Sequence, residues 1–329
     1  MRKALVVGID KYSACPLTGC ENDAVAVANT LEKNGDGSPN FSVRLLTSDS
    51  ENVTLALLGD AISELFKGDA DTAILFFAGH GIINPVTNAG YLVTQNGEKG
   101  AWGISLSDVL THANSAYPRI KSTVIILDSC HSGYAGEVAA LGNVNLAAIG
   151  TGVTILTACH REGTANEYNG HGLFTGLLLE GLSGTSADVC GRITPASIYS
   201  LIDQTLGAWK QRPIYKANVQ TFVTLRHVTP KIPLDVLRRL PIYFPNAADV
   251  FPLDPSFEPD RQNIPEGLRP IEVKSNNTRI FKELQACYQH GLVIPVDAEY
   301  MYYAAINSTG CRLTALGSHY RKLAESNLL

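Results

Sequence analysis

Five short apolar runs, separated from one another by helical or polar sequence, constrain the fold of this chain more than any other feature. The runs predict strands at residues 4–7, 43–46, 72–77, 123–127 and 153–157. Patterns typical of helices lie between them, at residues 23–34, 54–66 and 105–113. Strands that are apolar on both faces and alternate with helices are typical of a mainly parallel sheet covered on both sides. We therefore predict a three-layer α/β/α sandwich.

Two reactive side chains follow two of these runs. His80 lies in Phe-Phe-Ala-Gly-His-Gly (76–81), and Cys130 lies in Ile-Leu-Asp-Ser-Cys-His-Ser-Gly (126–133). Both would emerge at carboxyl ends of parallel strands, the sheet edge at which open α/β sheets bind ligands. A thiol becomes a useful nucleophile when a neighbouring base takes its proton. The sequence therefore predicts a cysteine–histidine dyad, although 50 positions separate the two residues.

These two segments resemble motifs of the caspase-like cysteine peptidases, and within them of the metacaspase and bacterial orthocaspase branch. Caspases carry a histidine about 50 residues before the catalytic cysteine. Animal caspases have Gln-Ala-Cys-x-Gly, whereas Asp-Ser-Cys-His-Ser-Gly from Asp128 resembles the metacaspase form. The resemblance extends over roughly residues 3–226, through further blocks at residues 5–12, 17–24, 155–159 and 171–175.

The resemblance implies a caspase-like sandwich and a role for each site residue. Cys130 would attack a peptide carbonyl, and His80 would generate the thiolate and later protonate the leaving amine. The backbone N–H groups of Gly81 and Cys130 would form the oxyanion hole. His131 competes with His80 as the base, but adjacent residues on a strand or turn usually point apart. A structural role is therefore favoured for His131.

Two acidic residues predict the substrate preference. Asp23 and Asp128 stand at positions that resemble the carboxylates lining the first substrate pocket (S1) of metacaspases. Such a pair would favour arginine or lysine over aspartate, so cleavage after basic residues is expected. Asp23 has a second interpretation, as the N-cap of a helix that starts at Ala24. Asp128 is harder to explain structurally, because an isolated buried carboxylate is costly.

Composition limits the partners and the compartment. The net charge of −5 gives no general reason to expect nucleic acid or an anionic membrane as partner. The amino-terminal residues show no signal-peptide pattern, and no apolar stretch reaches the 18 residues or so of a transmembrane helix. Seven cysteines, an odd number, do not suggest a disulfide framework. We expect a cytoplasmic protein.

No metal or cofactor is required by the predicted chemistry. Cys15 and Cys20 resemble half of a zinc site, but no second close pair of ligands accompanies them. Metacaspases commonly need calcium, yet the carboxylates show no EF-hand spacing. Calcium dependence is therefore left open.

The predicted peptidase domain occupies residues 1–228. By the resemblance, it comprises a large-subunit part at 1–132, a linker at 133–152 and a small-subunit part at 153–228. In the family the linker is often cut during activation, but this linker contains no lysine or arginine. An enzyme that cuts after basic residues cannot mature there, so control by binding is expected.

Two further segments are predicted beyond this domain. Nine prolines between Pro230 and Pro270 predict an extended connector at residues 229–274. Residues 275–329 show a helix at 277–290, a strand at 292–296, an aromatic strand at 301–306 and Leu-Thr-Ala-Leu-Gly (313–317), and this series resembles a winged-helix module. We expect this small α+β module to recruit a protein activator or scaffold.

Three functions compete at this point. The first is a cysteine endopeptidase, which similarity to bacterial caspase-like proteins with appended domains connects to antiviral defence or programmed cell death. The second is a DNA-binding or protein-binding regulator with a latent caspase-like domain. From Ser275 onward the chain has five basic and four acidic residues, and this excess of positive charge is too small for a DNA-binding module. The third is a silent scaffold, against which the intact His80 and Cys130 argue.

Overall fold

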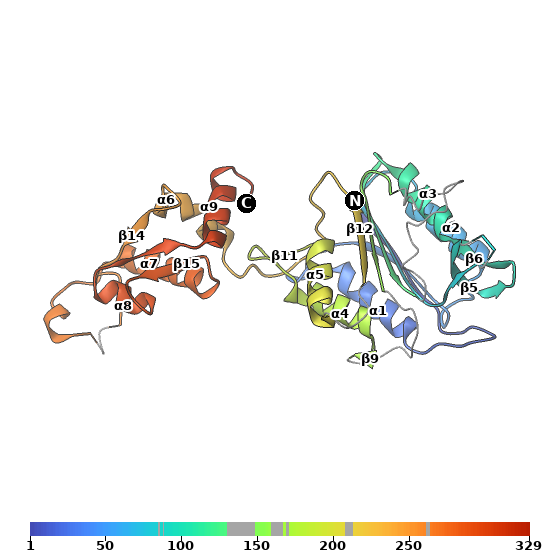
Figure 1. Ribbon diagram of the computed structural model, residues 1–329, viewed down its shortest axis with the longest axis horizontal. Coiled ribbons are helices and arrows are strands. Elements are labelled where there is room, and N and C mark those ends of the chain that lie inside the picture. The colour runs from blue at the N-terminus through green and yellow to red at the C-terminus, as the bar shows by residue number, and fades with distance from the viewer. Residues whose placement is uncertain are drawn as a thin grey trace. The chain divides into compact units, whose positions relative to one another are not determined.

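The computed structural model describes residues 1–84, 86–87, 89–129, 149–158, 167–168, 171–207, 213–260 and 264–329. The chain forms two compact units, Met1–Thr229 and Pro230–Leu329 (Figure 1).

The first unit is built on a six-stranded sheet with the strand order β12-β8-β7-β3-β1-β2. The strands are β1 (Arg2–Gly8), β2 (Ser42–Thr47), β3 (Ala70–Ala78), β7 (Ile120–Asp128), β8 (Val153–Thr157) and β12 (Ile214–Asn218). All neighbours pair in parallel except β12, which is antiparallel to β8. The prediction of a mainly parallel sheet is confirmed.

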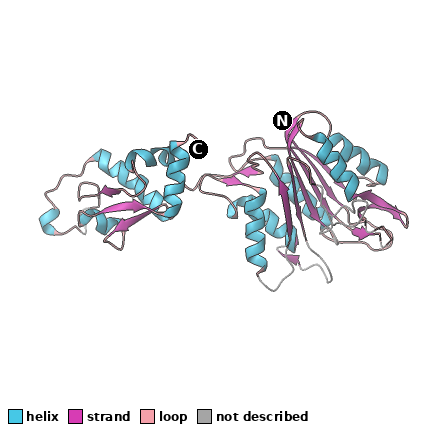
Figure 2. Cartoon of the chain, turned by 45° about the horizontal axis from the view of Figure 1, so that its top comes forward, coloured by secondary structure: helices cyan, strands magenta, loops and turns pink. Residues whose placement is uncertain are grey.

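Helices cover both faces of this sheet (Figures 1 and 2). One face carries α1 (Cys20–Glu32), α4 (Leu173–Glu180) and α5 (Pro195–Leu206), and the other carries α2 (Leu55–Leu65) and α3 (Leu106–Ala116). Phe76 and Phe77 show why β3 is apolar throughout. Successive side chains of a strand point to opposite faces, so the two rings, both fully buried, enter opposite cores. The predicted three-layer sandwich is confirmed.

Short elements complete the first unit. Strands β4 (Gly81–Ile83), β5 (Gly90–Glu98) and β6 (Ala101–Ser105) form an antiparallel sheet directly after β3. The remaining elements are β9 (Glu167–Tyr168), β10 (His171–Gly172), the π-helical η2 (Gly181–Thr185), β11 (Arg192–Ile193) and β13 (Arg226–His227). The β4–β6 sheet was not predicted, because its half-buried strands carry glycine and polar residues rather than an apolar run.

The second unit contains an antiparallel sheet with the order β14-β16-β15. Its elements are α6 (Leu234–Tyr243), β14 (Val250–Pro252), η3 (Glu266–Leu268), α7 (Ser275–Gln289), β15 (Val293–Val296), α8 (Met301–Ile306), β16 (Gly310–Leu313) and α9 (Ala315–Glu325). Within the described residues of Met1–Leu329, no helix is long and apolar enough to span a membrane.

Two expectations about this unit are wrong. Residues 229–274 were expected to be an extended connector, but they form α6 and β14 and belong to the second unit. Pro233 lies at the N-cap of α6 and Pro252 ends a strand at the edge of the sheet, two positions that tolerate proline, whereas Pro241 lies inside α6 near its end. Residues 301–306 were expected as an aromatic strand and form α8, whose buried Met301, Ala304 and Ala305 have helical spacing. The winged-helix assignment stays a prediction.

Candidate active site

The strands that precede the two predicted catalytic residues end together. Ala78, the last residue of β3, pairs with Asp128, the last residue of β7, and Gly79 N–H donates to the Asp128 carbonyl at 3.3 Å. His80 therefore stands at the carboxyl edge of the sheet, beside the strand that leads to the predicted nucleophile. Cys130 and His131 lie outside the described residues. The dyad stays a prediction.

A backbone carbonyl orients the His80 imidazole. Nε2 of His80 lies 2.7 Å from the carbonyl oxygen of Cys15. A carbonyl can only accept a hydrogen bond, so we assign the proton to Nε2 and leave Nδ1 of the neutral ring as the base. Sequence reasoning did not find this partner because any residue type supplies the same carbonyl.

The same loop supplies a second partner, Tyr12. Its hydroxyl accepts from the N–H of His80 at 3.0 Å and donates to the carbonyl of Val93 at 3.2 Å. Its ring also lies against the imidazole, with centroids 4.6 Å apart. Burial raises the pKa of Tyr12 well above its ordinary value, which keeps the phenol protonated and neutral.

Gly81, the predicted oxyanion donor, begins β4. The N–H of Val93 donates to the carbonyl of His80 at 2.9 Å, which makes these two residues a hydrogen-bonded pair of the ladder. Hydrogen-bonded and non-hydrogen-bonded pairs alternate in antiparallel sheets, and the next pair is Gly81 with Leu92. The N–H of Gly81 therefore points away from β5. Its role in an oxyanion hole stays a prediction.

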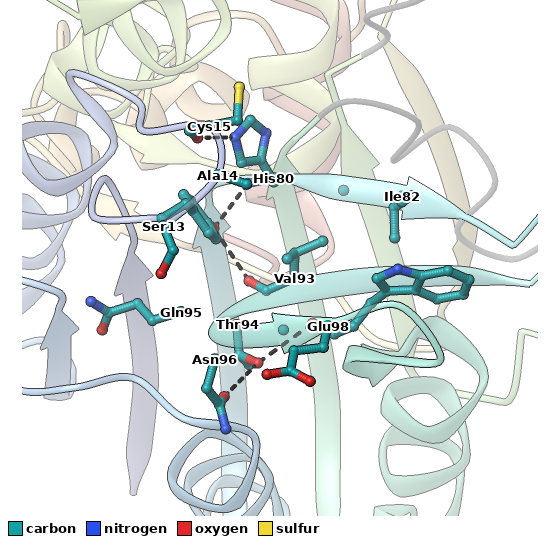
Figure 3. A pocket seen from close by; sticks show the side chains of 14 residues that line it. Ser13, Ala14, Cys15, His80, Ile82, Val93, Thr94, Gln95, Asn96 and Glu98 are labelled. Carbon is teal, nitrogen blue, oxygen red and sulfur yellow. Dashed lines mark hydrogen bonds between the residues drawn. The ribbon is translucent and has the colours of Figure 1, made fainter.

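A cavity of about 410 Å³ opens beside His80. The loop after β1 lines it through residues that include Tyr12 and Cys15, and the β5–β6 hairpin lines it through residues that include Glu98 and Trp102. Cys15, His80 and Glu98 are labelled in Figure 3. Substrate sites are usually apolar cavities that contain a few polar groups, and this cavity beside the predicted general base has that composition.

The structure brings Asp23 and Asp128 to the same place, beside Gly172. Asp23 lies in the first turn of α1 and is only 3% exposed, and Asp128 ends β7. A Cβ atom added to Gly172 would lie 3.3 Å from Oδ2 of Asp23 and 3.3 Å from Oδ2 of Asp128. The space in front of Gly172 is therefore flanked by two carboxylates.

Each carboxylate has a hydrogen-bond donor from the segment around α4. Nδ1 of His171 lies 2.7 Å from Oδ1 of Asp23, and the hydroxyl of Thr175 donates to Oδ2 of Asp128 at 2.6 Å. Asn22 Nδ2 also lies 3.3 Å from Nδ1 of His171. Because a carboxylate only accepts and its contact is shorter, we assign a proton to Nδ1 that it donates to Asp23. His171 and Thr175 were not predicted as site residues.

The environment of Asp23 disfavours its charge. The pKa of Asp23 is raised to about 6: burial is the largest cause and the neighbouring charge of Asp128 acts in the same direction, whereas hydrogen bonds from His171 and Gly172 act in the opposite direction. The protein therefore compensates the negative charge of this buried carboxylate poorly. A cationic side chain that entered beside Asp23 would stabilise its charged form.

The alternative role of Asp23 as a helix cap is wrong. Helix α1 begins at Cys20 rather than at Ala24, and its first N–H groups, those of Cys20 and Glu21, donate to the carboxylate of Asp10 at 3.0 and 3.2 Å. Sequence reasoning missed Asp10 because it caps from ten positions away, across a loop.

No metal cluster is evident in the part of the chain that the structure describes, where no three His, Cys, Asp or Glu side chains are grouped to hold an ion. Cys15 and Cys20, the pair considered for zinc, are both free, with Cys15 exposed. Burial and the nearby charge of Asp10 raise the pKa of the Cys20 thiol, which makes it a poor thiolate ligand. Calcium dependence stays untested.

Comparison with known proteins gives one family and several similar folds. The family model described as the caspase domain matches residues 1–222. A solved protein from Geobacter sulfurreducens is 18% identical, with a TM-score of 0.48 over 69% of this chain and 98% of that chain. Caspase-1 from Spodoptera frugiperda is 12% identical, with a TM-score of 0.46 over 69% and 90% of the two chains. The Drosophila initiator caspase Dronc is 11% identical, with a TM-score of 0.46 over 65% and 78%. Comparison with curated proteins gave no significant match.

Proposed function

The chain belongs to the caspase-domain family, a family of cysteine peptidases, and from this premise we propose that its first unit cuts protein chains after arginine or lysine. The observation that carries the specificity is the convergence of Asp23 and Asp128 on Gly172, at the sheet edge that also holds His80. A guanidinium or ammonium group placed there would contact both carboxylates.

The reaction proceeds by acyl transfer to Cys130. Nδ1 of His80 takes the thiol proton, and the thiolate sulfur attacks the carbonyl carbon of the scissile bond. The N–H of Gly81 stabilises the oxyanion that forms. The C–N bond then breaks as His80 returns the proton to the leaving amine, and a water molecule deprotonated by His80 hydrolyses the thioester.

The test is cleavage of matched fluorogenic peptides that end in arginine, lysine or aspartate, with and without calcium. Turnover of the basic peptides that disappears in Cys130→Ala and falls strongly in Asp128→Ala supports both the dyad and the acidic pocket. A preference for aspartate would remove the pocket assignment and leave the dyad in place. Cleavage that persists in Cys130→Ala would contradict the nucleophile.

Control by a binding partner fits the chain better than self-cleavage. The linker at residues 133–152 contains no lysine or arginine. The second unit is compact in its own right, which suits it to receive a protein activator or scaffold. The free thiols of the described cysteines suit a reducing compartment such as the cytoplasm. Intact mass after full turnover should show no cut between residues 133 and 152, and a cut there would contradict this control.

A further inference from the structure

We propose that Tyr12 is the positioning residue for the predicted base, holding the backbone of His80 with its hydroxyl and the imidazole with its ring. This inference rests on the proposed role of His80. The hydroxyl of Tyr12 takes no part in the proton transfer in this arrangement, because it is committed to two backbone groups.

The hydroxyl of Tyr12 stands in place of one hydrogen bond of the ladder. In a regular antiparallel pair, His80 and Val93 would exchange two direct N–H to carbonyl bonds. Only one is direct, from the N–H of Val93 to the carbonyl of His80 at 2.9 Å. On the other side the Tyr12 hydroxyl is inserted, 3.0 Å from the nitrogen of His80 and 3.2 Å from the oxygen of Val93. The inserted hydroxyl separates the backbones of His80 and Val93 on that side of the pair. It thereby fixes the backbone direction at His80, directly before β4.

The imidazole is held by the same loop that carries Tyr12. The tyrosine ring packs on it at 4.6 Å with an angle of 54° between the planes. Three residues further along, the carbonyl of Cys15 lies 2.7 Å from Nε2. The loop therefore holds His80 at its backbone N–H, at its ring face and at Nε2, and none of these contacts uses Nδ1.

Gly79 leaves the space that the hydroxyl occupies. A Cβ atom at residue 79 would lie 2.5 Å from the oxygen of Tyr12 and 3.1 Å from Cζ of Phe77. Phe77 is fully buried in the core and has little freedom to move, so the added atom would displace the tyrosine hydroxyl. Gly79→Ala is thus a second way to break the same contact without changing Tyr12.

The test measures alkylation of Cys130 by iodoacetamide, resolved cysteine by cysteine with mass spectrometry across the pH range in which imidazole and thiol titrate. In the wild type we expect fast alkylation of Cys130 below the ordinary thiol pKa, and its loss in His80→Ala. Tyr12→Phe keeps the ring and removes only the hydroxyl. We expect its rate at low pH to fall on the order of tenfold, since misplacing a catalytic group by 1 Å can cost about 100-fold. The pH profile should move toward that of an ordinary cysteine.

Two controls separate positioning from general damage. Tyr199→Phe removes a hydroxyl from α5, where the ring stacks on Tyr215 away from His80, and should leave the profile unchanged. Alkylation of Cys15, which is exposed in the same loop, should also stay constant. An equal change at Cys15 would show that the whole loop has moved and would overturn the proposal.

The double variant decides the mechanism. Gly79→Ala alone should slow Cys130 alkylation about as much as Tyr12→Phe does, but should add little in the Tyr12→Phe background, where the clash with the hydroxyl no longer exists. Effects that multiply would overturn the shared contact. A wild-type profile that does not depend on His80 would remove the dyad and this inference together, whereas dependence on His80 without any effect of Tyr12→Phe would remove this inference alone.

Discussion

Nδ1 of His171 lies 2.7 Å from Oδ1 of Asp23, so an imidazole already occupies one oxygen of a carboxylate that we assign to the substrate pocket. The other oxygen, Oδ2, receives only a long hydrogen bond of 3.4 Å from the N–H of Gly172. It is this second oxygen that faces the same point as Oδ2 of Asp128. Asp23 therefore has one oxygen committed to His171 and one that faces the shared point with only a long hydrogen bond, whereas Oδ2 of Asp128 at that point also accepts from the hydroxyl of Thr175.

The first prediction concerns the pH dependence of binding. Because burial raises the pKa of Asp23 to about 6, the carboxyl loses its charge as the pH falls through that value. The KM for arginine peptides should therefore rise on acidification through about pH 6. A matched peptide that ends in citrulline, which lacks the charge, should show no such rise in KM. Identical profiles for the two peptides would contradict the role of Asp23.

The second prediction is a trade between stability and activity at Asp23. Folding raises the pKa of the Asp23 carboxyl from about 3.8 in the unfolded chain to about 6. The stability that this group contributes is therefore present below about pH 3.8 and is lost as the pH rises through about 6. Asp23→Asn removes this penalty and keeps an oxygen for the proton of His171. At neutral pH we expect the free energy of unfolding to stay equal or rise, while kcat/KM for arginine peptides falls. Urea denaturation measures the free energy of unfolding, and peptide cleavage measures kcat/KM. A large loss of stability in Asp23→Asn would contradict the assigned cost of burying the charged carboxylate.

The third prediction uses the space in front of Gly172. A methyl group there would lie 3.3 Å from both carboxylate oxygens, close enough to hinder a cation between them but compatible with folding. Gly172→Ala should raise the KM for arginine peptides about tenfold or more, a loss of about 1.4 kcal/mol of binding, with little change in melting temperature. Gly59→Ala is the matched control, because its Cβ would meet only Ile104, at an ordinary 3.5 Å.

Sequence patterns predicted what depends on periodicity and missed what depends on long-range geometry. The apolar runs around Phe76 and Val124 predicted strands to within one to three residues of their observed limits, because runs that are apolar on both faces are typical of strands in a covered parallel sheet. The two carboxylates were found because a family motif marks their positions. Tyr12 and the carbonyl of Cys15 act through contacts across the fold, and nothing local marks them. Residues 301–306 were misassigned because aromatic content outweighed the helical spacing of the buried positions.

The fourth prediction concerns the packing that places Asp23. A Cβ atom at Gly8 would lie 2.3 Å from the carbonyl oxygen of Cys20 and 2.7 Å from Cβ of Ala24, so α1 can approach β1 this closely only because residue 8 has no side chain. Gly8→Ala must push α1 outward. We expect a loss of about 1–3 kcal/mol of unfolding free energy, together with weaker arginine cleavage as Asp23 moves. Urea denaturation of Gly8→Ala beside Gly59→Ala measures this, and an unchanged midpoint would contradict the close packing.

The last prediction separates the two units by their stability. In the second unit Arg239 donates to both oxygens of Glu283, from Nε at 2.8 Å and from the terminal Nη2 at 2.9 Å. The hydroxyl of Tyr243 donates to the same carboxylate at 2.5 Å, which ties α6 to α7.

Glu283 is only 11% exposed in its side chain, so Arg239→Ala would leave a largely buried carboxylate with fewer donors. We expect the second unit to lose about 1–3 kcal/mol, less than for a fully buried pair because the guanidinium is partly exposed. Arg238→Ala is the matched control: this neighbour donates to the backbone carbonyl of Leu329, in an exposed contact.

In calorimetry of the full chain, Arg239→Ala should lower the melting temperature of one transition, and the peptidase unit should retain its own. Cleavage of arginine peptides measured below the lowered transition should then match the wild type. Destabilisation of both units together would show that they unfold as one cooperative body, and partner binding to the second unit would then act on the peptidase through global stability.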